Sequence, residues 1–206
     1  MAYRSRDKTR KKKDAKRTAM MQAAVHVFAE KGYHSATVRD VVQAADVAIG
    51  TFYFYFPDKE TLFVHLYEET ADFLLQTIGQ AMAGRLTLSQ QVYAGLSAYM
   101  NIAVYEPAVV QLLLVGGVGT VPSLTAKRAA FRLKLIQMWQ RALDGALAQS
   151  VIVSQNIRRV AEAITGATDE VVLQLLEQPD PEEGVETAVH ELAAFVLRAV
   201  GYDDLN

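Results

Sequence analysis

The sequence contains no cysteine in its 206 residues. Disulfide bonds, thiolate catalysis and cysteine-based zinc sites are therefore excluded. A signal peptide is also missing, because the N-terminal residues are charged and include no apolar segment. The lack of cysteine fits a reducing compartment, and we expect a cytoplasmic protein.

Long uncharged segments are few, and only two approach the length of a membrane span. Residues 86–105 contain several polar side chains, and residues 107–126 are interrupted by glycines and by Pro122. We interpret both segments as helices buried inside a globular domain, and we expect no membrane partner.

Residues suited to catalysis or metal binding are scarce as well. The four histidines form no HExxH or other ligand spacing, and the sequence has no GxSxG motif or phosphate loop. Asp169 and Glu170 are adjacent on a predicted helix, so they point in different directions and indicate a polar face. We therefore expect no catalytic residue, no metal and no cofactor, with an enzyme kept as the alternative.

Charge is unevenly distributed, although the net charge is only −2. Residues 1–62 contain 12 Lys and Arg against 7 Asp and Glu, whereas residues 63–206 contain 9 against 16. Residues 1–13 are strongly basic and have too few apolar side chains to pack, which predicts a flexible arm or a solvated tail. A basic N-terminal region followed by an acidic remainder predicts that the N-terminal region contacts a polyanion.

Apolar residues recur at three- and four-residue spacing after Asp14, which predicts an all-α fold. The expected helices cover residues 14–31, 37–44, 49–56, 58–82, 88–105, 107–115, 123–149, 154–177 and 182–200. Residues 51–56 alternate as a strand would, but a strand at this place would have no partner.

Local signals set the helix ends between residues 32 and 58. Gly32 suits a left-handed helix end, and Thr37 with Asp40 forms a capping box. Pro57 ends the helix over residues 49–56, and Asp58 caps the next one.

The helix over residues 49–56 has two faces. Phe52 and Phe56 lie one turn apart and predict the face that packs on the first helix. The residues expected to point the other way are Ile49, Gly50, Tyr53 and Phe54.

A motif over residues 17–66 carries a family resemblance. Its residues are Ala29-Glu30-Lys31-Gly32-Tyr33, Thr37, Val38, Asp40, Val47, Gly50-Thr51, Tyr53, Tyr55-Phe56, Lys59-Glu60 and Leu62. In order and spacing the motif resembles the TetR family of repressors. The resemblance implies a helix-turn-helix DNA-binding domain over residues 14–60 and an effector-binding and dimerisation domain over residues 61–206. It implies a one-component repressor that binds a palindromic operator as a homodimer and is released by a small hydrophobic effector.

Five positions depart from the family's usual residues. Asp46 replaces a turn glycine and tolerates left-handed geometry. Val42 replaces a small residue, and Ala48 replaces a serine cap, so the recognition helix loses a capping oxygen. Ile49 and Phe54 replace a lysine and a histidine. The recognition surface is therefore apolar, and we expect it to contact thymine methyl groups alongside polar contacts.

The resemblance places the helix over residues 49–56 in the DNA major groove. Thr51 and Tyr53 would bond phosphate oxygens, with a simple packing role as the alternative for Tyr53. Helix N-termini at Thr37 and Lys59 would attract phosphate through their N–H groups. The predicted DNA-binding residues are Thr37, Val38, Ala48, Ile49, Gly50, Thr51, Tyr53, Phe54 and Lys59.

The resemblance also implies an effector pocket among the helices over residues 88–149. Aromatic and methionine side chains with scattered hydroxyls suit such a cavity, and an ordinary core is the alternative. The predicted lining residues are Tyr99, Tyr105, Phe131, Leu135, Met138 and Trp139.

The last two predicted helices carry apolar stripes with small residues. In the family, equivalent helices form a four-helix bundle with a partner subunit, and a two-fold protein suits a palindromic operator. The predicted interface residues are Ala163, Ala167, Val171, Val189, Leu192 and Val196. Packing within one chain is the alternative for the stripes. A structural protein that bridges DNA is the alternative for the whole chain.

Overall fold

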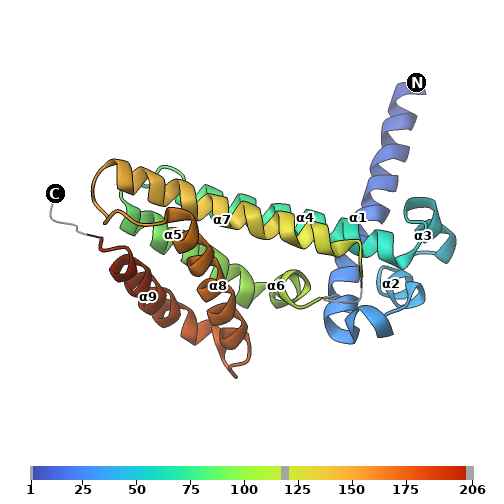
Figure 1. Ribbon diagram of the computed structural model, residues 1–206. Helices are drawn as coiled ribbons and strands as arrows, with labels where there is room; N and C mark the ends of the chain where they lie inside the picture. The colour runs from blue at the N-terminus through green and yellow to red at the C-terminus, as the bar shows by residue number, and fades with distance from the viewer. Residues whose placement is uncertain (1, 117–120, 203–206) are drawn as a thin grey trace. The chain divides into compact units, whose positions relative to one another are not determined.

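The computed structural model describes residues 2–116 and 121–202, with side chains from residue 15 onward. Every regular element in these ranges is an α-helix, which confirms the predicted all-α fold (Figure 1). The helices are α1 (Ala2–Ser35), α2 (Val38–Ala44), α3 (Ile49–Tyr55), α4 (Lys59–Met82), α5 (Leu88–Tyr105), α6 (Pro107–Leu114), α7 (Leu124–Ala148), α8 (Ile157–Leu176) and α9 (Pro181–Ala199). After α1, each helix end lies within three residues of its predicted position.

Helix α1 differs from its prediction at its start. It begins at Ala2, although the sequence predicts a flexible arm over residues 1–13 and a helix from Asp14. This segment has neither glycine nor proline, and Lys and Arg have high intrinsic helix propensities. Near the other end, Gly32 interrupts the helix with a φ of 72° and a ψ of 162°, a conformation open to glycine.

The described residues form two compact units. The first comprises residues up to Thr70 together with Gln111–Thr125, and the second comprises Ala71–Val110 together with the residues from Ala126 onward. The chain crosses between the two units within α4, within α6 and near the start of α7.

Packing of α1 against α2 and α3 forms the core of the first unit. Phe52 and Phe56 are buried there, as their one-turn spacing predicts. Phe28 and Phe63 meet edge to face, with ring centroids 4.8 Å apart. This aromatic contact holds the start of α4 against α1.

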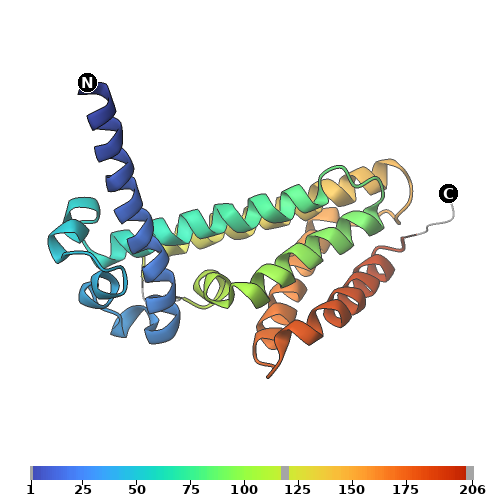
Figure 2. The ribbon, with the colours of Figure 1, turned by 180° about the vertical axis from the view of Figure 1, so that it is seen from behind.

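Helix α5 lies against α8 and α9 in the second unit (Figures 1 and 2). Gly95 of α5 makes room for the core, because a Cβ there would lie 2.8 Å from Trp139 Cη2 and 3.0 Å from Met82 Sδ. On α4, Leu74 is buried, but its neighbour Phe73 is 51% exposed. Adjacent helical residues point about 100° apart, so only one of the two faces the core.

Candidate DNA-binding surface and effector groove

Helix α3 presents an apolar face to solvent. The exposed fractions of Ile49, Tyr53 and Phe54 are 45%, 56% and 64%, whereas Phe52 is fully buried. This confirms the predicted orientation of the helix. The space in front of Gly50 is also open, because a Cβ there would meet nothing within 4 Å.

The residue types of α3 restrict what this face can recognise. Residues Ile49–Tyr55 include no charged or amide side chain, so polar contacts fall to the hydroxyls of Thr51 and its tyrosines. Ala48 precedes the helix without a side-chain capping bond, as its residue type predicts. The exposed apolar side chains suit contacts with methyl groups, such as that of thymine at a base edge.

Polar side chains fix the start of α2. The backbone N and Oγ1 of Thr37 both donate to Asp40 Oδ2 at 2.8 Å, and Asp40 N donates back to Thr37 Oγ1 at 3.2 Å. This is the predicted capping box. Lys31 Nζ donates to Asp40 Oδ1 at 2.8 Å. Hydrogen bonds from Lys31 and then Thr37 lower the pKa of Asp40 to about 2.

The turn between α2 and α3 depends on Asp46. Its φ is 50°, in the left-handed region, as expected for the residue that replaces the usual glycine. Val38 is half-buried and Thr37 is exposed at the start of α2, so both remain candidates for contact with DNA.

Lys59 has its side chain engaged within the chain. Its ammonium group donates to the carbonyl oxygens of Tyr33 at 2.7 Å, Ala36 at 2.9 Å and His34 at 3.3 Å. It also lies 4.4 Å from the centroid of the Tyr33 ring. Three acceptors match the three N–H donors of a lysine. The ammonium group of Lys59 is therefore already engaged, and its backbone N–H group remains the candidate for the phosphate contact predicted at this helix start.

The predicted effector residues do not gather around one cavity. Tyr99, Phe131, Leu135 and Trp139 are buried, as the alternative of an ordinary core predicts. Tyr105 is 67% exposed at the end of α5, which corrects its placement in an enclosed pocket. The sequence spacing of α5 does not show that Tyr99 is buried in the core while Tyr105, at the end of the helix, is exposed.

Asp169 of α8 is half-buried in the second unit, whereas Glu170 is exposed, so the predicted polar face is correct for Glu170 and wrong for Asp169. Tyr99 donates its hydroxyl to Asp169 Oδ1 at 3.0 Å, and Arg132 donates to Asp169 Oδ2 at 3.0 Å. Burial raises the pKa of Asp169 although both partners favour its charged form. Its partners come from α5 and α7, far away in the sequence, so no local pattern reveals the cluster.

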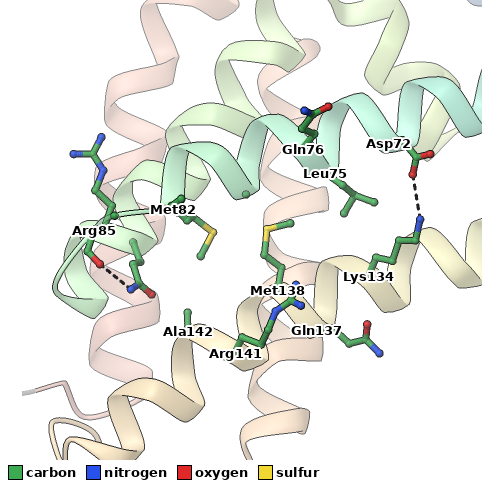
Figure 3. A pocket seen from close by; sticks show the side chains of 14 residues that line it. Asp72, Leu75, Gln76, Met82, Arg85, Lys134, Gln137, Met138, Arg141 and Ala142 are labelled. Carbon is green, nitrogen blue, oxygen red and sulfur yellow. Dashed lines mark hydrogen bonds and ion pairs between the residues drawn. The ribbon is translucent and has the colours of Figure 1, made fainter.

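A groove of about 700 Å³ lies between α4 and α7 in the second unit (Figure 3). Its apolar and small lining residues are Leu75, Gly79, Met82, Ala83, Gly84, Met138 and Ala142. Its polar lining residues are Asp72, Gln76, Arg85, Gln91, Lys134, Gln137 and Arg141. Met138 is the predicted effector residue found here. The volume falls within the roughly 300–1,000 Å³ of small-molecule sites.

A second groove, of about 720 Å³, lies between α5 and α9. Tyr93 Oη and His190 Nδ1 are 2.9 Å apart there. Its charged lining residues include Glu182, Glu186 and Glu191, which gives this groove an acidic rim. The two grooves therefore differ in the sign of their charge.

The predicted dimer residues fall into two groups. On α8, Ala163 is exposed while Ala167 and Val171 are half-buried, so this face remains available to a partner. On α9, the exposed fractions of Val189, Leu192 and Val196 are only 7%, 6% and 1%. These three pack within their own chain, and their burial corrects the prediction that they face a partner. The exposed large apolar residue of α9 is Phe195.

Two further features concern metals and membranes. Among the described residues, no group of three His, Asp or Glu side chains is placed to hold a metal ion. No helix in the described ranges combines the length and apolarity needed to cross a bilayer.

Two family models match the chain. Residues 20–66 match the model described as "Bacterial regulatory proteins, tetR family". Residues 89–198 match the model described as "Tetracyclin repressor-like, C-terminal domain". Together they span the helix-turn-helix segment and most of the second unit.

Curated relatives are transcriptional regulators. The fatty acid metabolism regulator protein of Bacillus subtilis (strain 168) is 25% identical over 172 residues, which cover 79% of this chain and 84% of that protein. The transcriptional repressor KstR2 of Rhodococcus jostii (strain RHA1) is 28% identical over 109 residues, covering 49% of this chain and 53% of the repressor. These matches agree with the prediction of a regulator and not with an enzyme.

Solved structures show the same fold. FadR from Bacillus subtilis in complex with stearoyl-CoA aligns with a TM-score of 0.75 at 19% identity, covering 86% of this chain and 97% of FadR. FadR from Bacillus halodurans aligns with a TM-score of 0.73 at 22% identity, covering 85% of this chain and 97% of that FadR. With both family models matched and the fold shared, the chain belongs to the TetR family of bacterial transcriptional regulators.

Proposed function

We propose that this regulator is a repressor that binds a palindromic operator as a homodimer and leaves it when a small hydrophobic effector binds. The observation that carries the proposal is the exposed face of α3, where Ile49, Tyr53 and Phe54 stand outward on a helix anchored by Phe52. A recognition helix of this kind reads base edges in the major groove.

Phosphate contacts would position α3 on the operator. The candidates are the hydroxyls of Thr51 and Tyr53 and the backbone N–H groups at the starts of α2 and α4. The basic residues of the 1–13 segment would add charge neutralisation. With about four phosphate contacts per subunit, a dimer would show a log–log salt slope of about −7.

The exposed face of α8 supports a dimer. Ala163, Ala167 and Val171 leave a surface of small side chains that permits close approach of a second subunit. Ala167→Glu should dissociate the dimer and leave the chain folded, because Ala167 is only half-buried in its own chain and a charge there would be fully buried only at the interface. Val189→Glu should instead unfold the second unit, since Val189 is 7% exposed in its own chain. Sedimentation velocity and thermal melting separate these outcomes.

Two relatives support a fatty acyl effector. One is named a fatty acid metabolism regulator, and a solved neighbour of the same fold holds stearoyl-CoA. An apolar ligand also suits the apolar residues between α4 and α7. We propose that such a ligand lowers the affinity of the dimer for its operator.

Selection from a randomised duplex library tests the function, followed by fluorescence anisotropy with the selected duplex. We expect an enriched palindrome bound by two subunits, and release when an acyl compound is added. Deleting residues 1–13 should flatten the salt slope and leave the preferred sequence unchanged. Binding without sequence preference, unaffected by any acyl compound, would instead identify a structural DNA-bridging protein.

A further inference from the structure

The groove between α4 and α7 is open because α4 lacks a side chain at Gly79. A Cβ built on Gly79 would meet only Met138 Cε, at 3.9 Å, which is ordinary van der Waals contact. In Figure 3 the side chains of Met82 and Met138 extend into the space between the two helices. Methionine is unbranched and adaptable, so this apolar strip can fit around a flexible hydrocarbon chain.

Cationic side chains line the same groove. Arg85, Lys134 and Arg141 contribute three positive charges, and Asp72 contributes one negative charge. Asp72 Oδ1 lies 3.1 Å from Lys134 Nζ, so these two partly offset each other. The remaining charge belongs to the two arginines.

Both arginines keep donors for a ligand. Arg85 uses its Nε to donate to the carbonyl of Ala81 at 3.2 Å, which leaves its terminal NH₂ groups. The side chain of Arg141 makes no hydrogen bond or ion pair within the described part of the chain. Guanidinium groups bind phosphate through paired N–H donors.

The connection between α4 and α5 holds Arg85 in place. Gly84 has a φ of 74°, which turns the chain after α4. Gln91 Nε2 then donates to the carbonyl of Arg85 at 3.1 Å, and Leu86 N donates to Gln90 Oε1 at 3.1 Å. These bonds fix the backbone of Arg85 beside the apolar strip.

We propose that this groove binds a molecule with a long apolar chain and a phosphate-bearing head. The chain lies along Gly79, Met82 and Met138, and Arg85 and Arg141 bind the phosphates. The inference rests on the proposed function and adds to it the location of the effector and the requirement for a charged head. A free fatty acid carries a single carboxylate, so it would form fewer charged hydrogen bonds with Arg85 and Arg141 than a phosphate-bearing head would.

Isothermal titration calorimetry of the full-length dimer, without DNA, tests the proposal with stearoyl-CoA, stearate and coenzyme A as probes. We expect stearoyl-CoA to bind at least about tenfold more tightly than either of its parts, since a tenfold ratio corresponds to one charged hydrogen bond. Equal affinity for stearate and stearoyl-CoA would overturn the role of the arginines.

Substitutions in the groove locate the ligand. Gly79→Leu fills the strip and should abolish stearoyl-CoA binding, while its melting temperature stays at or above that of the wild type because glycine disfavours a helix. Gly145→Leu is the matched control, since Gly145 lies on α7 with nothing within 4 Å of its Cβ position. Wild-type affinity in Gly79→Leu would place the ligand elsewhere.

Charge substitutions test the head. Arg85→Gln and Arg141→Gln should each weaken stearoyl-CoA binding about tenfold, as expected for a charged hydrogen bond. The control Arg159→Gln removes an exposed charge outside the groove and should leave binding unchanged. Asp72→Asn removes the negative charge and should tighten binding about threefold, the scale of an exposed ion pair. Unchanged affinity in both arginine variants would contradict the proposal.

Operator binding separates this inference from the proposed function. If stearoyl-CoA binds the groove but the operator complex persists, the effector role fails and the groove assignment stands. If stearoyl-CoA releases the operator from wild type and Gly79→Leu alike, the groove assignment fails and the effector role stands.

Discussion

The α3 face and the α4–α7 groove are built in opposite ways. On α3, side chains project outward, and buried Phe52 holds them in position. In the groove, open space results from a side chain that is missing at Gly79. DNA binding by α3 should therefore be lost when atoms are removed beneath the helix, and ligand binding in the groove should be lost when atoms are added at Gly79.

The largest effect is expected from Phe52→Ala. Removing a fully buried ring leaves a cavity in the first unit and should lower the free energy of unfolding by about 3 kcal/mol or more. Chemical denaturation measures the change, and operator binding should weaken with it. Exposed Phe54, changed to Ala, is the control and should leave stability nearly intact.

Adding a methyl group at Gly95 should destabilise the second unit. Gly95→Ala places a Cβ 2.8 Å from Trp139 Cη2, and such overpacking costs about 1–3 kcal/mol. Gly145→Ala should instead stabilise by about 0.5–1 kcal/mol, because alanine favours the helix. Thermal melting compares the two. Equal behaviour would contradict the packing of Trp139 on Gly95.

A smaller effect is expected at the hydroxyl of Tyr53. Tyr53→Phe should weaken binding to all duplexes by about 1 kcal/mol, the contribution of a typical hydrogen bond, and leave the preferred sequence unchanged. Stability should not change, because Tyr53 is 56% exposed. Loss of stability in Tyr53→Phe, with none in Phe52→Ala, would mean that α3 is rotated.

The smallest effect is expected on the pH dependence of stability, through Asp40. The pKa of Asp40 is lowered to about 2 from its ordinary 3.8, so its stabilising contribution is present above the ordinary value and is lost as pH falls towards 2. Asp40→Asn should therefore melt below the wild type at neutral pH, and the two should converge near pH 2. A constant difference would show that the capping box does not depend on this charge.

The first unit was predictable from the sequence to a finer level than the second. The capping box of Thr37 and Asp40 and the left-handed Asp46 depend on neighbouring residues, so local patterns reveal them. The side-chain contacts of Lys59 join residues 23 to 26 positions apart, and no local pattern indicates them.

Sites in the second unit depend on packing between distant helices. Arg85 and Arg141 line the same groove although they come from distant parts of the sequence, and the half-buried carboxylate of Asp169 takes its partners from α5 and α7. The apolar spacing predicted that α8 and α9 are helices. It did not show whether the apolar face of α9 packs on α5 of the same chain or meets a partner subunit. A glycine inside a predicted helix, such as Gly79, was the one local signal of the groove.

The most direct test of the central claim is sequence selection by wild type and Ile49→Ala from one randomised duplex library. If α3 reads the operator, the wild type enriches a palindrome, and Ile49→Ala loses discrimination at one base pair per half-site by roughly 1 kcal/mol. All other positions should keep their preference, and the melting temperature should stay unchanged because Ile49 is 45% exposed. Identical selections from the two proteins, or no enrichment by the wild type, would contradict the account.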